Sequence, residues 1–137
     1  MPSTPPNVIA GGTIRPSRFV SISAAYTVIE GTANAEVIGI SGVNSNKAPI
    51  PEVTTNYHAE SGEQVVLHGE GEVSALVLGG TVAAGDKLKS DGNGAGVVCA
   101  SSGTTRQFYG ARALQAGSSG ETIEVMVEIG SVRPALV

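Results

Sequence analysis

The chain has 137 residues, enough for one domain with a modest hydrophobic core. Its formal net charge of −4 argues against a nucleic-acid binder, which needs a basic surface to displace counterions from phosphates. The chain contains 19 glycines and 7 prolines but no tryptophan, so long helices are disfavoured and the core must be built mainly from small aliphatic side chains. We therefore expect an all-β fold with frequent turns, and a thin core of this kind favours an oligomer.

The first 17 residues differ in composition from the rest. They contain four prolines among small polar residues, and their only aliphatic side chains larger than alanine are Val8, Ile9 and Ile14. Proline stiffens such a segment and lowers the entropy that it loses on docking to another surface. We expect an extended N-terminal arm over residues 1–17, followed by a single β-rich domain over residues 18–137. A frayed terminus is the alternative interpretation of the arm.

Strand candidates follow in chain order and are rich in β-branched or alternating apolar residues. They cover residues 18–22, 26–29, 35–40, 64–69, 73–78, 87–90, 96–100, 108–114 and 122–129. In the last segment, Ile123, Val125, Val127 and Ile129 fall on one face, which we expect to be core, while Glu124 and Glu128 face outward. The proline-containing stretch 44–58 is expected to be a surface excursion.

Three turns have a similar sequence, at residues 60–63, 83–86 and 118–121. In each, the third residue is a glycine, which can take the positive φ of a tight turn, and an acidic residue opens the next strand. Related strands precede the first and the last of these turns, which suggests two related β units in one barrel or sandwich. The run Asp91-Gly92-Asn93-Gly94 predicts a hairpin turn, because Asp-Gly and Asn-Gly are strong hairpin signals. It lacks the alternating acids and the closing glutamate of a calcium loop.

The sequence offers little for catalysis or for metal binding. His58 and His68 are the only histidines, and no serine or cysteine stands in a nucleophile motif. Cys99 lies in an apolar stretch and is expected to be a buried thiol rather than a reactive one. We therefore predict that the protein is not an enzyme and has no cofactor and no metal site. The chain shows no secretory signal and no bilayer-spanning stretch, so we expect it to be made in a host cytoplasm without membrane association.

The last fifty or so residues resemble bacteriophage head decoration proteins, also called capsid cement proteins. The resemblance rests on residues 83–86, the glycine-rich hairpin that follows, the run Tyr109 to Leu114, the turn 116–121 and the alternating strand to Gly130. It implies a compact small β-barrel or sandwich, β-tulip-like and commonly a homotrimer. It also implies a location on the outer capsid surface of the virion, where the protein binds the major capsid protein and stabilises the mature head.

The residues that contact the capsid are expected in or beside the arm. Before Glu30 the only charged side chains are Arg15 and Arg18, whereas residues 52–72 carry five glutamates and no lysine or arginine. We predict that Arg15 and Arg18 pair with acidic capsid residues, and that the apolar anchors are Ile9, Ile14 and Phe19. The alternative function is a receptor- or carbohydrate-binding β-module of a phage fibre or tail, against which the scarcity of aromatic residues argues.

Overall fold

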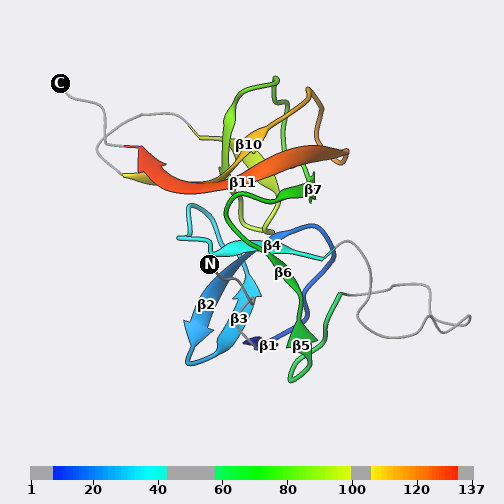
Figure 1. Cartoon of the computed structure of the whole chain (residues 1–137), viewed down its shortest axis with the longest axis vertical. Helices are drawn as coiled ribbons and strands as arrows, with labels where there is room; N and C mark the ends of the chain where they lie inside the picture. Colours follow the sequence, from blue (N-terminus) through cyan, green and yellow to red (C-terminus); the bar gives the residue numbers. More distant parts are fainter. Residues whose placement is uncertain (1–7, 43–57, 100–105, 133–137) are drawn as a thin grey trace, which may run out of the picture.

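The computed structural model describes residues 8–42, 58–99 and 106–132, and within these ranges it contains eleven β-strands and no helix. The strands form two sheets, one above the other in Figure 1. The first sheet has the spatial order β5 (Gln64–Val65), β1 (Val8–Ala10), β3 (Thr27–Glu30), β2 (Phe19–Ala24), β4 (Gly39–Ser41), β6 (Leu67–His68). The second has the order β7 (Val73–Val77), β11 (Thr122–Val132), β10 (Gln107–Ala113), β8 (Lys87–Ser90), β9 (Gly96–Val98). The all-β prediction is confirmed.

The first sheet is almost closed into a small barrel. Its two edge strands, β5 and β6, are separated only by Val66, so the chain itself joins the edges. At this seam the Val66 N–H donates to Nε2 of the buried His58 at 2.9 Å, and the Val66 carbonyl accepts from the Gly42 N–H at 3.0 Å. The interior is filled by a cluster of small side chains: Val8, Ala10, Ile14, Val20, Val28, Ala59, Val65 and Leu67.

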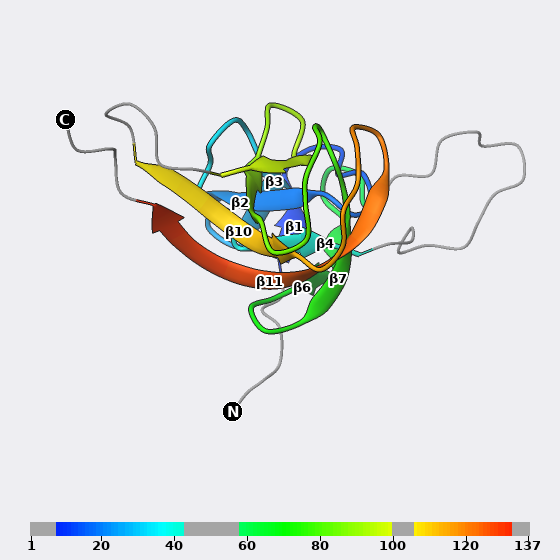
Figure 2. The same cartoon turned by 90° about the horizontal axis from the view of Figure 1, so that it is seen from above.

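The second sheet curls in the same way and packs on the barrel. A parallel bridge between Leu78, just after β7, and Gly96 in β9 brings its two edges together. Between the sheets lies the larger core cluster: Phe19, Val37, Ile40, Leu76, Leu78, Val82, Leu88, Ala111, Ala113, Ile123, Val125 and Val127. Figure 2, seen from above, shows β10 and β11 as a long curved pair. The cluster joins this pair to the barrel, because Phe19 of β2 and Ile40 of β4 belong to it. Because alternate residues of a strand face opposite sides, β2 supplies Phe19 to one core and Val20 to the other.

Main-chain hydrogen bonds also join the two sheets. Phe19 N–H donates to the Gly94 carbonyl at 2.8 Å, Asn34 N–H to the Ser90 carbonyl at 3.0 Å, and Val77 N–H to the Ser17 carbonyl at 3.0 Å. Each bond connects the barrel, or the segment leading into it, with the second sheet or its turns. The shared core and these bonds tie the sheets into one body.

Most of the predicted strands are present, with three differences. Residues 35–38 precede β4 rather than forming part of it, and β1 was not predicted. Residues 8–17, which we expected in the arm, lie within the barrel, because β1 pairs with both β3 and β5 and Ile14 bridges to Ala59. Residues 1–7 of the predicted arm and most of the predicted excursion at 44–58 lie outside the described residues.

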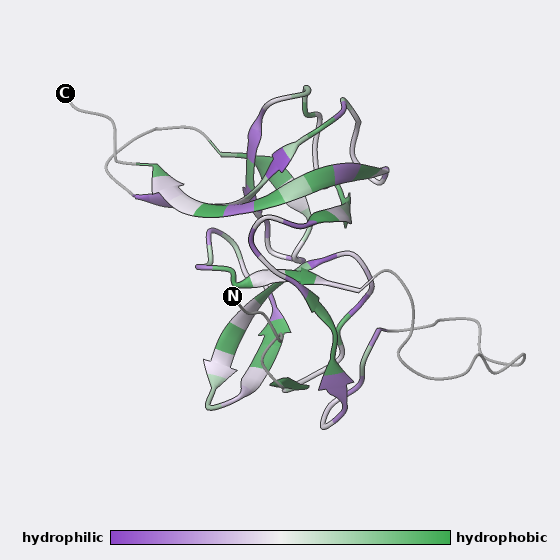
Figure 3. Ribbon diagram, in the orientation of Figure 1, coloured by the Kyte–Doolittle hydropathy of each residue, from purple (hydrophilic) through white to green (hydrophobic). Residues whose placement is uncertain are grey.

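The alternating pattern of β11 is confirmed up to Val127, and Figure 3 shows its hydrophobic and hydrophilic bands. Ile123, Val125 and Val127 are buried, but Ile129 is 37% exposed, so its assignment to the core was wrong. The cause is a β-bulge: Ala111 is paired with Val127, but the next pair in the ladder is Tyr109 with Gly130. Beyond this bulge, β11 follows a new register.

The three similar turns form as predicted. Gly62, Gly85 and Gly120 have φ values of 87°, 92° and 89°, in the left-handed region. The acid after each glycine does more than open a strand, because its carboxylate accepts the N–H at the first position of the turn, at 2.6 to 2.9 Å. A fourth turn, at residues 69–72, has the same construction, with Gly71 at φ 92° and Glu72 accepting the Gly69 N–H at 2.6 Å.

Candidate interaction surfaces

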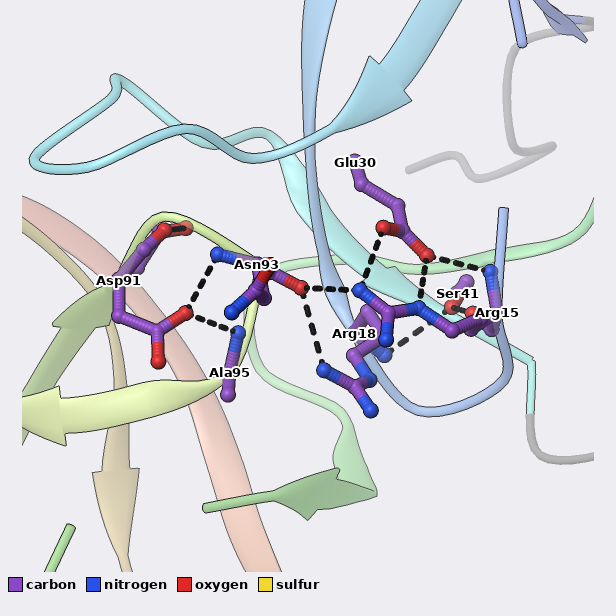
Figure 4. A network of polar contacts seen from close by, with 8 residues as sticks. Arg15, Arg18, Glu30, Ser41, Asp91, Asn93 and Ala95 are labelled. Carbon is purple, nitrogen blue, oxygen red and sulfur yellow. Dashed lines mark hydrogen bonds and ion pairs between the residues drawn. The ribbon is translucent and has the colours of Figure 1, made fainter. Parts of the chain in front are cut away.

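Arg15 and Glu30 form a partly buried ion pair on the barrel side of the molecule (Figure 4). The Glu30 carboxylate accepts three hydrogen bonds from Arg15, from its main-chain N–H at 2.6 Å and from Nε and Nη2 at 3.0 Å each. Arg15 Nη2 also donates to the main-chain carbonyl of Asn93 at 3.2 Å. Because Asn93 lies in the turn between β8 and β9, Arg15 connects the end of β3 with the second sheet.

Arg18 binds the same carbonyl from the other side. Its Nη1 donates to the Asn93 oxygen at 3.2 Å, and its main-chain N–H donates to Ser41 Oγ at 3.1 Å, which itself donates to the Arg15 carbonyl at 2.7 Å. Burial, followed by the charge of Arg15, lowers the pKa of the Arg18 guanidinium from its ordinary value, while Glu30 and Asp91 act in the opposite direction. We refer to Arg15, Arg18, Glu30 and Ser41 as the arginine cluster.

The turn that receives the arginine cluster is itself held rigidly. Asp91 Oδ1 accepts the N–H groups of Asn93 at 2.7 Å and Ala95 at 3.0 Å, and Gly94 takes a φ of 76°. This confirms the predicted hairpin turn. Its geometry presents the Asn93 carbonyl toward both arginines, so the cluster has a structural role as a clamp between the sheets.

The five residues predicted to contact a capsid occupy different environments. Ile14 and Phe19 are both 0% exposed, in the barrel interior and the inter-sheet core, so neither offers a surface to a partner in this fold. Arg15 and Arg18 are half-buried in the arginine cluster. Ile9, on β1, is 45% exposed and is the one member of the set with a large exposed apolar side chain. Their contact with a capsid stays a prediction.

The titratable groups that could serve chemistry are dispersed. Nε2 of His58 is occupied by the Val66 N–H at the barrel seam, and His68 Nδ1 lies 3.7 Å from Glu72 Oε2. Within residues 8–42, 58–99 and 106–132, no three His, Cys, Asp or Glu side chains are grouped so that they could hold a metal ion. Across the same ranges, no helix has the length and apolarity needed to cross a membrane. That the protein is not an enzyme stays a prediction.

A groove of about 570 Å³ lies where β10 and β11 extend beyond their sheet. Strand β8 pairs with β10 only at Ala111 and Arg112, and β7 pairs with β11 only as far as Met126. The ends of β10 and β11 therefore continue as a two-stranded ribbon, which projects sideways in Figures 1 and 2. The groove lies between this ribbon and the barrel and is lined by Ile22, Glu36, Val37, Ile38, Phe108, Tyr109, Ile129, Gly130 and Ser131.

The groove was not predicted from the sequence, although both of its most exposed apolar residues were placed in strands. Ile22 is 63% exposed near the end of β2, and Ile129 is 37% exposed beyond the β-bulge. On the β10 side, the Asn34 side chain occupies the strand edge: Nδ2 donates to the Arg106 carbonyl at 3.0 Å and Oδ1 accepts the Phe108 N–H at 3.1 Å. The exposure of Ile129 in the groove depends on the β-bulge, which is set by the pairing of β10 with β11. No local sequence pattern therefore predicts the groove.

The comparisons with known proteins identify a fold rather than a family. No protein-family model matches the chain, and a search of curated proteins found no match. Among solved structures, the chain is similar to the crystal structure of the head fiber gp8.5 N base in bacteriophage phi29. The TM-score is 0.52 at 14% sequence identity, and the similarity covers 89% of this chain and 91% of that chain. At this identity the similarity establishes the shared fold alone.

Proposed function

We propose that this protein is a structural component of a phage virion, a capsid decoration or cement protein that binds the outer surface of the mature head. The observation that carries the proposal is the fold similarity to a phage head fiber base, which spans nine-tenths of both chains. The resemblance of the last fifty residues to head decoration proteins supports the same conclusion. The partner would be the major capsid protein.

The mechanism would be mechanical. A protein that binds the mature lattice and not its dissociated or immature forms stabilises that lattice by mass action. Many copies, each bridging neighbouring capsid subunits, would oppose the outward pressure of packaged DNA even if each contact is weak. A body of two sheets joined by a shared core and by the arginine cluster suits this role, because load on one sheet is transmitted to the other.

The capsid contact that fits the structure best is the neighbourhood of Ile9 together with residues 1–7. Ile9 keeps 45% of its side chain exposed on β1, whereas Ile14 and Phe19 are buried and Arg15 and Arg18 are engaged in the clamp. An exposed isoleucine can anchor an interface by losing its apolar surface to a partner. Of the five residues predicted to contact the capsid, this proposal keeps Ile9 and adds the segment 1–7 before it.

Cosedimentation with empty mature heads that lack the protein tests the proposal. We expect the wild type to pellet with heads, and deletion of residues 2–7 or the change Ile9→Glu to reduce binding. Val73→Glu is the matched control, because Val73 is 51% exposed on β7 in the other sheet. A wild type that stays in the supernatant would overturn the function. Full binding by both altered proteins would overturn only the contact.

A second function has one specific observation in its favour, since the similar structure is named as part of a head fiber. In this alternative the protein is a receptor- or carbohydrate-binding module of a phage fibre or tail. Binding to host cells or to a glycan array, combined with no binding to heads, would support the alternative over the cement function.

A further inference from the structure

We propose that the groove beside the β10–β11 ribbon receives residues 135–137 of a second copy of this chain, so that copies assemble head to tail. This inference goes beyond capsid binding and does not depend on it. It rests on the groove's lining, on the sequence that follows β11, and on the direction in which β11 leaves the body.

The lining is suited to apolar side chains. Ile22, Phe108 and Ile129 come from three strands and line a space of about 570 Å³. Ile22 is 63% exposed and Ile129 is 37% exposed. An exposed apolar concavity with a polar rim is typical of an interaction site. Two or three aliphatic residues would fill the space and bury these side chains.

The edge of β11 beside the groove is also available for pairing. Within the described part of the chain, β7 covers β11 only up to Val127, through the Gly71 and Glu72 main chain, and no strand pairs with its outer edge beyond that residue. A free strand edge offers main-chain donors and acceptors to an added extended segment. The groove can therefore hold an extended peptide by both side-chain and main-chain contacts.

The sequence that follows β11 supplies such a peptide. After Val132 come Arg133, Pro134 and then the apolar run Ala135-Leu136-Val137. Five extended residues span roughly 17 Å, enough to reach an adjacent molecule. A residue before proline favours an extended conformation, so Arg133 resists the immediate reversal that would return the run to its own groove. Since β11 projects away from the body, we assign the run to a neighbouring copy.

Charge fits the same arrangement. Glu36 is the acidic residue of the groove lining and is exposed. Arg133 is separated from the apolar run by Pro134 alone. Opposite charges at the rim of an interface help to fix its register. A groove on one copy that takes a segment from the next makes a heterologous contact, which closes into a ring when the rotation allows. A trimer of the kind expected from the sequence resemblance would be one such ring.

Disulfide trapping distinguishes the possible occupants. In a Cys99→Ala background, Ile22→Cys and Leu136→Cys would be combined in one chain and the protein oxidised. We expect disulfide-linked dimers and larger species on a non-reducing gel. The matched control replaces Ile22→Cys by Ser119→Cys, in the exposed turn at the opposite end of β11, and should give few cross-links. A disulfide within one chain, or cross-linking no greater than the control, would overturn the proposal.

Sedimentation of the protein without Cys changes gives an independent measurement. We expect wild type to be oligomeric and Leu136→Asp to weaken association by roughly tenfold or more, because a buried leucine is replaced by a charge. Leu114→Asp is the control, at a residue 47% exposed just after β10. A monomeric wild type, or equal mass for wild type and Leu136→Asp, would contradict head-to-tail assembly. Neither result decides whether the protein binds capsids at all, which the cosedimentation of the wild type with heads measures separately.

Discussion

Gly110 is a position where the second sheet packs tightly against core side chains of the barrel side, and replacing it with alanine tests this packing directly. It lies in β10 at the β-bulge, facing the core between the sheets. A Cβ at this position would overlap Cγ2 of Val37 and lie 2.8 Å from Cε1 of Phe19. Both neighbours are almost fully buried in the core between the sheets. We expect Gly110→Ala to force the sheets apart locally.

The expected cost follows from the two overlaps. Overpacking a dense core typically costs 1–3 kcal/mol, and two simultaneous contacts below van der Waals distance place Gly110→Ala at about 2–3 kcal/mol. Val37→Ala alone removes two methyl groups and should cost about 2 kcal/mol. In the double variant, Val37→Ala also removes the methyl group that the Cβ at position 110 would overlap. The loss in free energy of unfolding should then be about 1–2 kcal/mol smaller than the sum of the two single losses.

Urea unfolding of the four proteins, wild type included, measures each free energy and the coupling. Gly12→Ala is the control, because no atom lies within 4 Å of the position of its Cβ, and it should stay within about 0.5 kcal/mol of wild type. If Gly110→Ala also stayed within that margin, or if its cost and that of Val37→Ala were simply additive, the close approach of the sheets at this point would be refuted.

Two further predictions concern buried polar groups. His58→Phe fills similar space but gives the Val66 N–H no acceptor at the barrel seam, so urea unfolding should show a loss of about 1–3 kcal/mol. His58→Gln offers a carbonyl acceptor and should lose less; equal losses would count against the bond. Burial raises the pKa of the Cys99 thiol, against the opposing charges of Lys89 and Lys87. At mildly alkaline pH, Cys99 should therefore react with iodoacetamide more slowly in the native protein than in urea, and equal rates would contradict its burial.

The local alternation of apolar and polar residues was enough to predict most strands, because buried and exposed residues alternate along them within a few positions. Strand β1 was missed for a physical reason: its three residues pair with β3 and β5, which are distant in sequence, and such pairing leaves no local signature. Hydrogen bonding to two neighbours ordered a segment that composition alone marked as unlikely to fold. The same limitation hid the exposure of Ile129, since the β-bulge that causes it depends on pairing with β10.

The sequence predicts the glycines of the turns, but it does not predict that the acids after them accept hydrogen bonds within the turns. Glu63, Asp86 and Glu121 each accept the N–H that opens their own turn, and Glu72 does so in a fourth turn that sequence similarity did not single out. Two of the five glutamates in the stretch 52–72, Glu63 and Glu72, thus accept main-chain hydrogen bonds within their own turns.

The sequence likewise did not predict the partners of Arg15 and Arg18 in the arginine cluster. A positive charge in a proline-rich segment favours a contact with an acidic partner, yet sequence does not reveal that Glu30 and the Asn93 carbonyl lie within reach. Charge pairing across 15 residues and a carbonyl contact across 78 residues are set by the fold. Among the described residues, our two candidate surfaces for partners are therefore apolar: the vicinity of Ile9 and the groove beside the β10–β11 ribbon.

These two surfaces have a combined consequence for binding strength. The inter-sheet core and the arginine cluster hold β1 and the ribbon in one rigid body, so the position of Ile9 relative to the groove is fixed. Copies joined through their grooves would present several Ile9 surfaces at set positions, and the second contact of such a ring with a capsid would form at a high effective concentration. Apparent affinity for heads should then fall when Leu136→Asp breaks the ring, even though each Ile9 contact is unchanged. A direct contact of Leu136 with the capsid would lower the affinity as well. A ring trapped by a disulfide in the Ile22→Cys, Leu136→Cys protein separates the two explanations, because avidity predicts that this ring keeps its affinity for heads although Leu136 is replaced.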